Sequence, residues 1–132
     1  MAKINEWSVS DSAEAQDKAV QRTLSRHTTN AVEYIAIHLD EDLRLETLAQ
    51  ICFVSPQHLL RVFRAEMGVS VHQYIMQKRL LTARQYLQNG MLPTLAAQRC
   101  GFTNYPTFWR SYKKEYGVSP SDFKKMASSD FC

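Results

Sequence analysis

The sequence contains an internal repeat at an offset of 49 residues, which restricts the folds open to the chain more than any other feature. The aligned pairs are Phe53 and Phe102, Leu59 and Phe108, Arg61 and Arg110, Phe63 and Tyr112, Glu66 and Glu115, and the Gly-Val-Ser runs at 68–70 and 117–119. Each copy combines a short helix, a tight turn and a longer helix that ends at glycine. This order predicts two helix-turn-helix units.

Helical periodicity and capping signals extend this pattern over the rest of the chain. Asn30 with Glu33 resembles a capping box and predicts the start of the first helix. No segment alternates with period two over more than a few residues, so we expect no sheet. The predicted fold is all-α, with two helix-turn-helix lobes joined by a long linker helix. About seven helices are expected, near 30–39, 45–51, 56–67, 70–88, 93–101, 104–116 and from 119 onward.

The same signals divide the chain into segments. Residues 1–27 are polar and predict a tail or an extra surface helix, and residues 127–132 predict a C-terminal tail. One domain is expected to cover 28–126, with a first lobe at 28–69, the linker helix at 70–89 and a second lobe at 90–126.

Composition excludes several other classes of protein. The chain has no apolar run long enough to cross a membrane and no signal-like N-terminus. The three cysteines, Cys52, Cys100 and Cys132, form no CxxC pair, which fits a reduced cytoplasmic protein. Neither the cysteines nor the four histidines show metal-ligand spacing, and no catalytic motif is present. We therefore expect no enzyme activity, no metal, no cofactor and no membrane partner.

Charge is distributed unevenly along the chain. Residues 1–67 carry 7 Lys and Arg against 10 Asp and Glu, whereas 68–132 carry 9 against 3. The net charges are −3 and +6, so the second half is the basic one. This asymmetry indicates one surface for a polyanion and another for a different partner, although solvated charge explains it equally well.

The outer faces of the two longer helices carry similar side chains. Arg61 and Arg110 lie mid-helix opposite the apolar stripe, and a second cation follows one turn later in each copy, Arg64 or Lys113. Arginine can donate two hydrogen bonds to guanine, and glutamine, here Gln57, can pair with adenine in the same way. The second cation is placed to contact a phosphate.

The predicted linker sets the distance between the two units. A helix of about 18 residues spans about 27 Å, and successive major grooves lie about 34 Å apart on one face of DNA. One chain can therefore read two successive grooves. The two helices differ in sequence, so the expected target is asymmetric.

The sequence resembles the AraC/XylS-type bacterial transcription regulators over residues 28–126. In the first half the matching positions are Leu45, Leu48, Ala49, Ser55, Pro56, Leu59, Arg61, Phe63, Gly68, Tyr74, Ile75, Arg79, Leu80, Ala83 and Leu87. In the second half they are Cys100 to Asn104, Phe108, Arg110, Tyr112, Lys113 and Tyr116 to Phe123. The resemblance implies sequence-specific binding of promoter DNA and activation through RNA polymerase.

Positions carried over from this resemblance give the candidate site. The base-reading residues are Gln57, Leu60, Arg61, Tyr105, Pro106, Trp109 and Arg110. The phosphate-contacting residues are Ser55, His58, Arg64, Asn104, Thr107, Lys113 and Lys114. Pro106 has no long polar side chain, so the second helix is expected to depend on Arg110, backbone anchoring and DNA shape.

The resulting hypothesis is a regulator that binds double-stranded promoter DNA as a monomer, activates transcription, and works on the nucleoid in the bacterial cytoplasm. Two alternatives remain open. The acidic turn at 40–42 suits a helix-turn-helix module that binds a protein instead of DNA. About 27 residues precede the resembling region, so the chain is either a stand-alone regulator or the DNA-binding fragment of a larger effector-sensing one.

Overall fold

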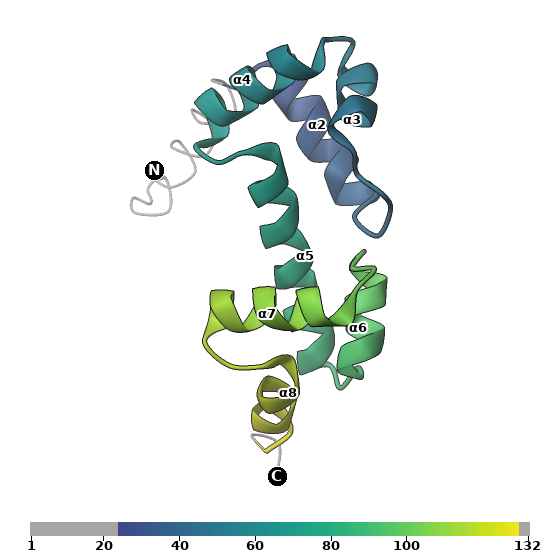
Figure 1. Cartoon of the computed structure of the whole chain (residues 1–132), viewed down its shortest axis with the longest axis vertical. Helices are drawn as coiled ribbons and strands as arrows, with labels where there is room; N and C mark the ends of the chain where they lie inside the picture. Colours follow the sequence, from purple (N-terminus) through teal and green to yellow (C-terminus); the bar gives the residue numbers. More distant parts are fainter. Residues whose placement is uncertain (1–23, 130–132) are drawn as a thin grey trace, which may run out of the picture.

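The computed structural model describes residues 24–129, which form seven helices and no strand. This confirms the predicted all-α fold with two helix-turn-helix lobes on a long linker helix (Figure 1). The predicted segment 1–27 falls largely outside the described residues, as do residues 130–132. The helices are α2 (Arg26–Ile37), α3 (Leu45–Cys52), α4 (Pro56–Met67), α5 (Val71–Gln88), α6 (Pro93–Arg99), α7 (Tyr105–Tyr116) and α8 (Pro120–Ser129).

Each lobe has its own hydrophobic core, and α5 contributes to both. The first core consists of Ala31, Ile35, Leu48, Ala49, Cys52, Leu59, Phe63, Val71 and Ile75. The second consists of Leu80, Ala83, Leu87, Ala96, Ala97, Cys100, Phe102, Phe108 and Tyr112. The linker helix therefore buries its first half against one lobe and its second half against the other. None of the described helices is long and apolar enough to cross a bilayer.

Polar side chains cap the starts of three helices. The side-chain oxygens of Ser55, Ser70 and Asn104 each accept a backbone hydrogen bond of 3.1 Å, at the starts of α4, α5 and α7. Gln73 completes a capping box by accepting a bond from the Ser70 N–H. These caps satisfy backbone donors that have no partner within the helix, and so fix where the helices start.

The predicted start of the first helix is wrong. Its N-cap is Ser25, whose hydroxyl accepts from the Thr28 N–H at 3.2 Å, and not Asn30. The Ser25 N–H donates to the Glu66 carboxylate in α4 at 2.7 Å. This contact across 41 residues holds the start of α2, and no local sequence pattern reveals it. The helix also ends at Ile37, before the predicted residue 39.

The repeat does not keep one register through the turn. Phe53 has a left-handed backbone with φ 59°, and its structural counterpart is Gly101 with φ 95°. The next residues, Val54 and Phe102, donate equivalent bonds to Ala49 and Ala97. Pairing Phe53 with Phe102 is therefore wrong. The offset is 48 residues between α3 and α6 and 49 residues between α4 and α7, because the second turn holds one more residue.

Phe53 is the one non-glycine residue with positive φ in the described part of the chain, and its side chain is 91% exposed. A left-handed backbone costs an L-residue about 1–2 kcal/mol, and the greater flexibility of glycine in the unfolded chain offsets part of this. We expect Phe53→Gly to raise the free energy of unfolding by about 0.5–1 kcal/mol in urea titrations. Phe53→Ala, which keeps the strain, should change little. A loss of stability in Phe53→Gly would show that the exposed ring stabilises the turn.

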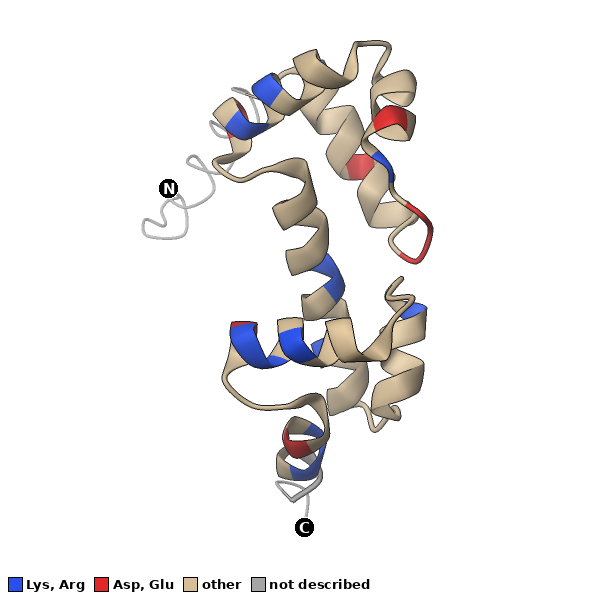
Figure 2. Ribbon diagram, viewed as in Figure 1, with Lys and Arg blue, Asp and Glu red and all other residues tan. Residues whose placement is uncertain are grey.

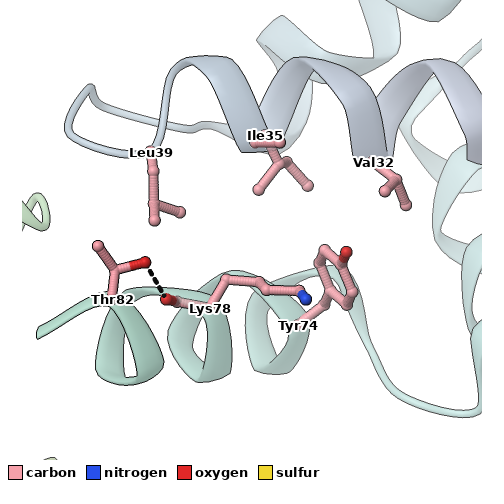
Figure 3. A pocket seen from close by; sticks show the side chains of 7 residues that line it. Val32, Ile35, Leu39, Tyr74, Lys78 and Thr82 are labelled. Atoms are coloured by element: carbon pink, nitrogen blue, oxygen red, sulfur yellow. Dashed lines mark hydrogen bonds between the residues drawn. The ribbon is translucent and has the colours of Figure 1, made fainter. Parts of the chain in front are cut away.

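The helices α2 and α5 face each other across an open groove of about 360 Å³ (Figure 3). Val32 of α2 and Leu39 of the turn that follows α2 point into it from one side. On the other side Lys78 lies over the Tyr74 ring, with its ammonium 5.5 Å from the ring centre. The groove is lined by residues between Val32 and Leu39 on one side and between Tyr74 and Thr82 on the other.

Candidate nucleic-acid interface

The first part of the candidate site is the outward face of α4. Leu59 and Phe63 are fully buried on the inner face, which fixes the rotation of the helix. The side chains of the opposite face are exposed together: Gln57, Leu60, Arg61 and Arg64. Leu60 is 43% exposed, which leaves its side chain free to contact a thymine methyl group.

His58 orients the central arginine of α4. Its Nδ1 lies 3.0 Å from the Arg61 guanidinium, one helical turn away. The His58 ring is itself held edge-on against His27 of α2, with ring centres 5.7 Å apart. Arg61 is therefore drawn toward the N-terminal end of α4. His58 remains a predicted phosphate contact through its other ring nitrogen.

The second part of the site is the outward face of α7. Phe108 and Tyr112 are fully buried and set the rotation of this helix. The exposed residues of the opposite face are Pro106, Arg110, Lys113 and Lys114. The two faces thus present a mid-helix arginine in the same orientation relative to their cores, as the repeat predicts.

Two of the predicted base-reading residues of α7 are partly committed to packing. Tyr105 is half-buried, and its ring lies 5.7 Å from that of Phe108. Trp109 is also half-buried, and the Lys113 ammonium lies over its ring at 5.1 Å. Of the predicted base-reading residues of α7, Arg110 is therefore the one with an exposed, long polar side chain.

The starts of both recognition helices carry the remaining predicted phosphate contacts. Ser55 and Asn104 are exposed, but each already uses its side-chain oxygen as an N-cap. Thr107 is half-buried and supplies the N–H that Asn104 accepts. The donors that remain for phosphate are free backbone N–H groups, the hydroxyl hydrogens of Ser55 and Thr107, and the side-chain amide NH2 of Asn104.

The outward faces of α4 and α7 are both basic. Figure 2 shows Lys and Arg along α4 and α7, whereas Asp and Glu gather at the turn between α2 and α3. That turn contains Asp40, Glu41 and Asp42, all exposed. Basic side chains on both recognition helices favour a polyanion such as the DNA backbone.

The described cysteines are packed in the cores and do not form a reactive site. Burial raises the pKa of the Cys52 thiol, and it raises that of Cys100 to about 12. Cys52 Sγ also donates to the His27 carbonyl oxygen at 3.3 Å. Since the thiolate is the nucleophile, these thiols are poorly suited to covalent chemistry. Among residues 24–129, no group of three or more His, Cys, Asp or Glu is placed to hold a metal.

The chain is similar in sequence to proteins with helix-turn-helix domains. A family model described as a helix-turn-helix domain matches residues 48–126. The multiple antibiotic resistance protein MarA of Escherichia coli is 31% identical over 108 residues, which cover 76% of this chain and 85% of MarA. The bifunctional transcriptional activator/DNA repair enzyme AdaA of Bacillus subtilis is 36% identical over 99 residues, covering 74% of this chain and 47% of AdaA.

A solved structure extends the similarity to three dimensions. The DNA-binding domain of the global transcriptional factor AdpA, determined in complex with a target DNA, aligns with a TM-score of 0.75 at 25% identity. The alignment covers 80% of this chain and 96% of that domain, and so includes both lobes. The chain spans less than half the length of several curated relatives that it matches, AdaA among them.

Proposed function

Because the chain belongs to the AraC/XylS-type family of helix-turn-helix DNA-binding proteins, we propose that it regulates transcription by binding promoter DNA sequence-specifically. In this proposal one monomer inserts α4 and α7 into two successive major grooves. The observation that carries it is the presence of two recognition faces, each fixed by a separate core and joined by one helix. The 18-residue α5 spans about 27 Å, close to the groove repeat of about 34 Å.

In this proposal some side chains read bases and others contact phosphates. Arg61 and Gln57 read bases in one groove and Arg110 reads the next, assisted by exposed edges of Trp109 and Tyr105. Positively charged side chains contact phosphates and set the position of the protein on the duplex. These are Arg64, Lys113 and Lys114, with the starts of α4 and α7 beside them.

The relatives favour activation as the sign of regulation, because AdaA is by name a transcriptional activator. We include in the proposal a contact with RNA polymerase, and a site of action on the nucleoid of a bacterial cell. The proposal contains no enzymatic step. AdaA is also by name a DNA repair enzyme, but the buried thiols of Cys52 and Cys100 do not support a comparable nucleophile here.

Selection of bound duplexes from random DNA tests the proposed function. The purified chain is incubated with the library at two salt concentrations, and the bound duplexes are sequenced. We expect one asymmetric site with two enriched patches about one helical turn, roughly 10.5 base pairs, apart. Affinity should fall steeply with salt, because bound phosphates release counterions. Failure to enrich any sequence, with weak binding lost at moderate salt, would contradict DNA reading and favour the protein-interaction alternative.

A further inference from the structure

Within residues 24–129, the two lobes come into direct contact beside α5. Figure 1 shows the turn between α2 and α3 reaching toward the turn between α6 and α7. If the lobes shared only α5, they could pivot about its middle, because the first core ends at Ile75 and the second begins at Leu80. A contact at this junction would oppose such a pivot.

Arg79 lies in that middle stretch of α5 and holds the first lobe by its backbone. Its Nε donates to the Leu39 carbonyl oxygen at 3.1 Å, and its Nη2 donates to that of Glu41 at 2.7 Å. Burial lowers the pKa of the guanidinium, and the nearby Asp42 carboxylate acts in the opposite direction. The planar guanidinium thus joins the linker to the α2–α3 turn with two bonds of fixed direction.

Gly101 brings the second lobe against the same carbonyl group. A Cβ atom at this position would lie 2.6 Å from the Leu39 oxygen and 2.9 Å from Arg79 Nε. The other described glycines also have positive φ, but a Cβ on Gly68, Gly90 or Gly117 would meet nothing within 4 Å. Gly101 is therefore distinguished by a close approach between the lobes and not by its backbone conformation.

The junction is local and polar. Its side chains border an open cavity of about 430 Å³ that is lined by Asp40, Glu41, Asp42, Arg79, Gly101 and Thr103. No large apolar side chain lines that cavity. The relative placement of the lobes thus depends at this point on a few hydrogen bonds and one backbone contact.

We propose that Leu39, Arg79 and Gly101 form an inter-lobe brace that sets the distance and angle between α4 and α7, and so the separation of half-sites that the protein accepts. This inference rests on the proposed function, because half-sites exist only if both helices read DNA. Arg79 and Gly101 are positioning residues in it and touch no base.

DNA geometry makes such a brace effective. Adding one base pair between half-sites moves the second by about 3.4 Å and turns it by about 35° around the duplex axis. A rigid pair of lobes cannot follow this change without losing contacts at one half-site. Lobes that pivot can follow it at lower cost.

A spacer series tests the brace. Duplexes carrying the selected half-sites at the optimal separation, or one base pair shorter or longer, are titrated with each variant. The wild-type chain should discriminate strongly among the three. For Arg79→Met, Arg79→Lys and Gly101→Ala, the ratio of affinities between the optimal and the altered spacing should fall by about 3- to 30-fold. This range follows from the coupling energies typical of such side-chain networks.

Matched controls separate the brace from general effects. Lys78→Met removes the same charge from the neighbouring position of α5 and keeps both Arg79 bonds. Gly90→Ala imposes the same strain as Gly101→Ala, since φ is 92° at Gly90 and 95° at Gly101, without the inter-lobe clash. Both controls should keep the wild-type spacing preference. An unchanged preference in the three brace variants would overturn the inference and leave the proposed function intact.

A measurement without DNA covers the case in which no paired half-sites are found. Spin labels on introduced non-natural residues at the exposed positions Ala65 of α4 and Glu115 of α7 report the distance between the recognition helices. The Arg79→Lys variant, which keeps the charge, should broaden this distance distribution in the free protein. A distribution as narrow as that of the wild-type chain would overturn the brace whatever the DNA result.

Discussion

Replacing Phe63 by alanine is expected to lower the free energy of unfolding by about 3–5 kcal/mol. The Phe63 side chain is fully buried in the first core, and its ring packs edge-on against Tyr74 at 5.5 Å. Truncation to alanine loses the free energy gained by burying the apolar ring away from water. It also leaves a cavity that the neighbouring helices fill incompletely. Urea denaturation followed by circular dichroism measures the change.

The two separate cores make the effect of this substitution uneven. Amides of α2, α3 and α4 should lose protection from hydrogen exchange, whereas those of α6 and α7 should keep most of theirs. On DNA, Phe63→Ala should lose the patch read by α4 and keep weak recognition of the other. Leu60→Ala is the control, because Leu60 is 43% exposed on the same helix and should change stability by less than about 0.5 kcal/mol. Equal loss of protection in both lobes would contradict independent cores.

Replacing Arg61 by alanine is expected to cost about 1–3 kcal/mol of binding free energy and to relax specificity at one base pair. Arg61 is exposed at the centre of the outward face of α4, and His58 orients its guanidinium. An arginine held in this way has fewer conformations to lose when it pairs with guanine. Competitive titration against single-base variants of the selected site measures both quantities.

Arg64 provides the matched control on the same helix. Because it is predicted to contact a phosphate, Arg64→Ala should weaken all sequences alike and reduce the salt slope by about one unit. Lys113→Ala should behave in the same way for α7. If Arg61→Ala weakened every sequence equally, Arg61 would be a phosphate contact and the assignment of base-reading residues in α4 would be wrong.

Much of the fold is predictable because its signals are local. Ser55, Ser70 and Asn104 cap helices in the structure as their sequence context predicts. The start of α2 is not predictable from local sequence, because Ser25 is held by Glu66 of another helix. The change of offset within the repeat has no local signal, because Phe53 adopts a left-handed backbone that glycine usually occupies.

The candidate site likewise has features that the sequence predicts and features that depend on tertiary packing. Apolar stripes on α4 and α7 determine which side chains are exposed, so Arg61 and Arg110 were identified from spacing alone. The half-burial of Tyr105 and Trp109 depends on how the second lobe packs, and no sequence period gives it. No local pattern reveals the role of Arg79, because the residues whose carbonyl groups it contacts lie 38 and 40 positions away in the sequence.

The central claim is that one chain reads two successive major grooves through α4 and α7. Replacing single guanines by 7-deazaguanine in the selected duplex removes the N7 acceptor and tests this most directly. The account predicts two clusters of sensitive guanines about one helical turn, roughly 10.5 base pairs, apart on one face, with one protein bound per duplex. Arg61→Ala should abolish sensitivity in one cluster, and Arg110→Ala in the other. A single cluster, or two clusters that require two bound proteins, would contradict the account.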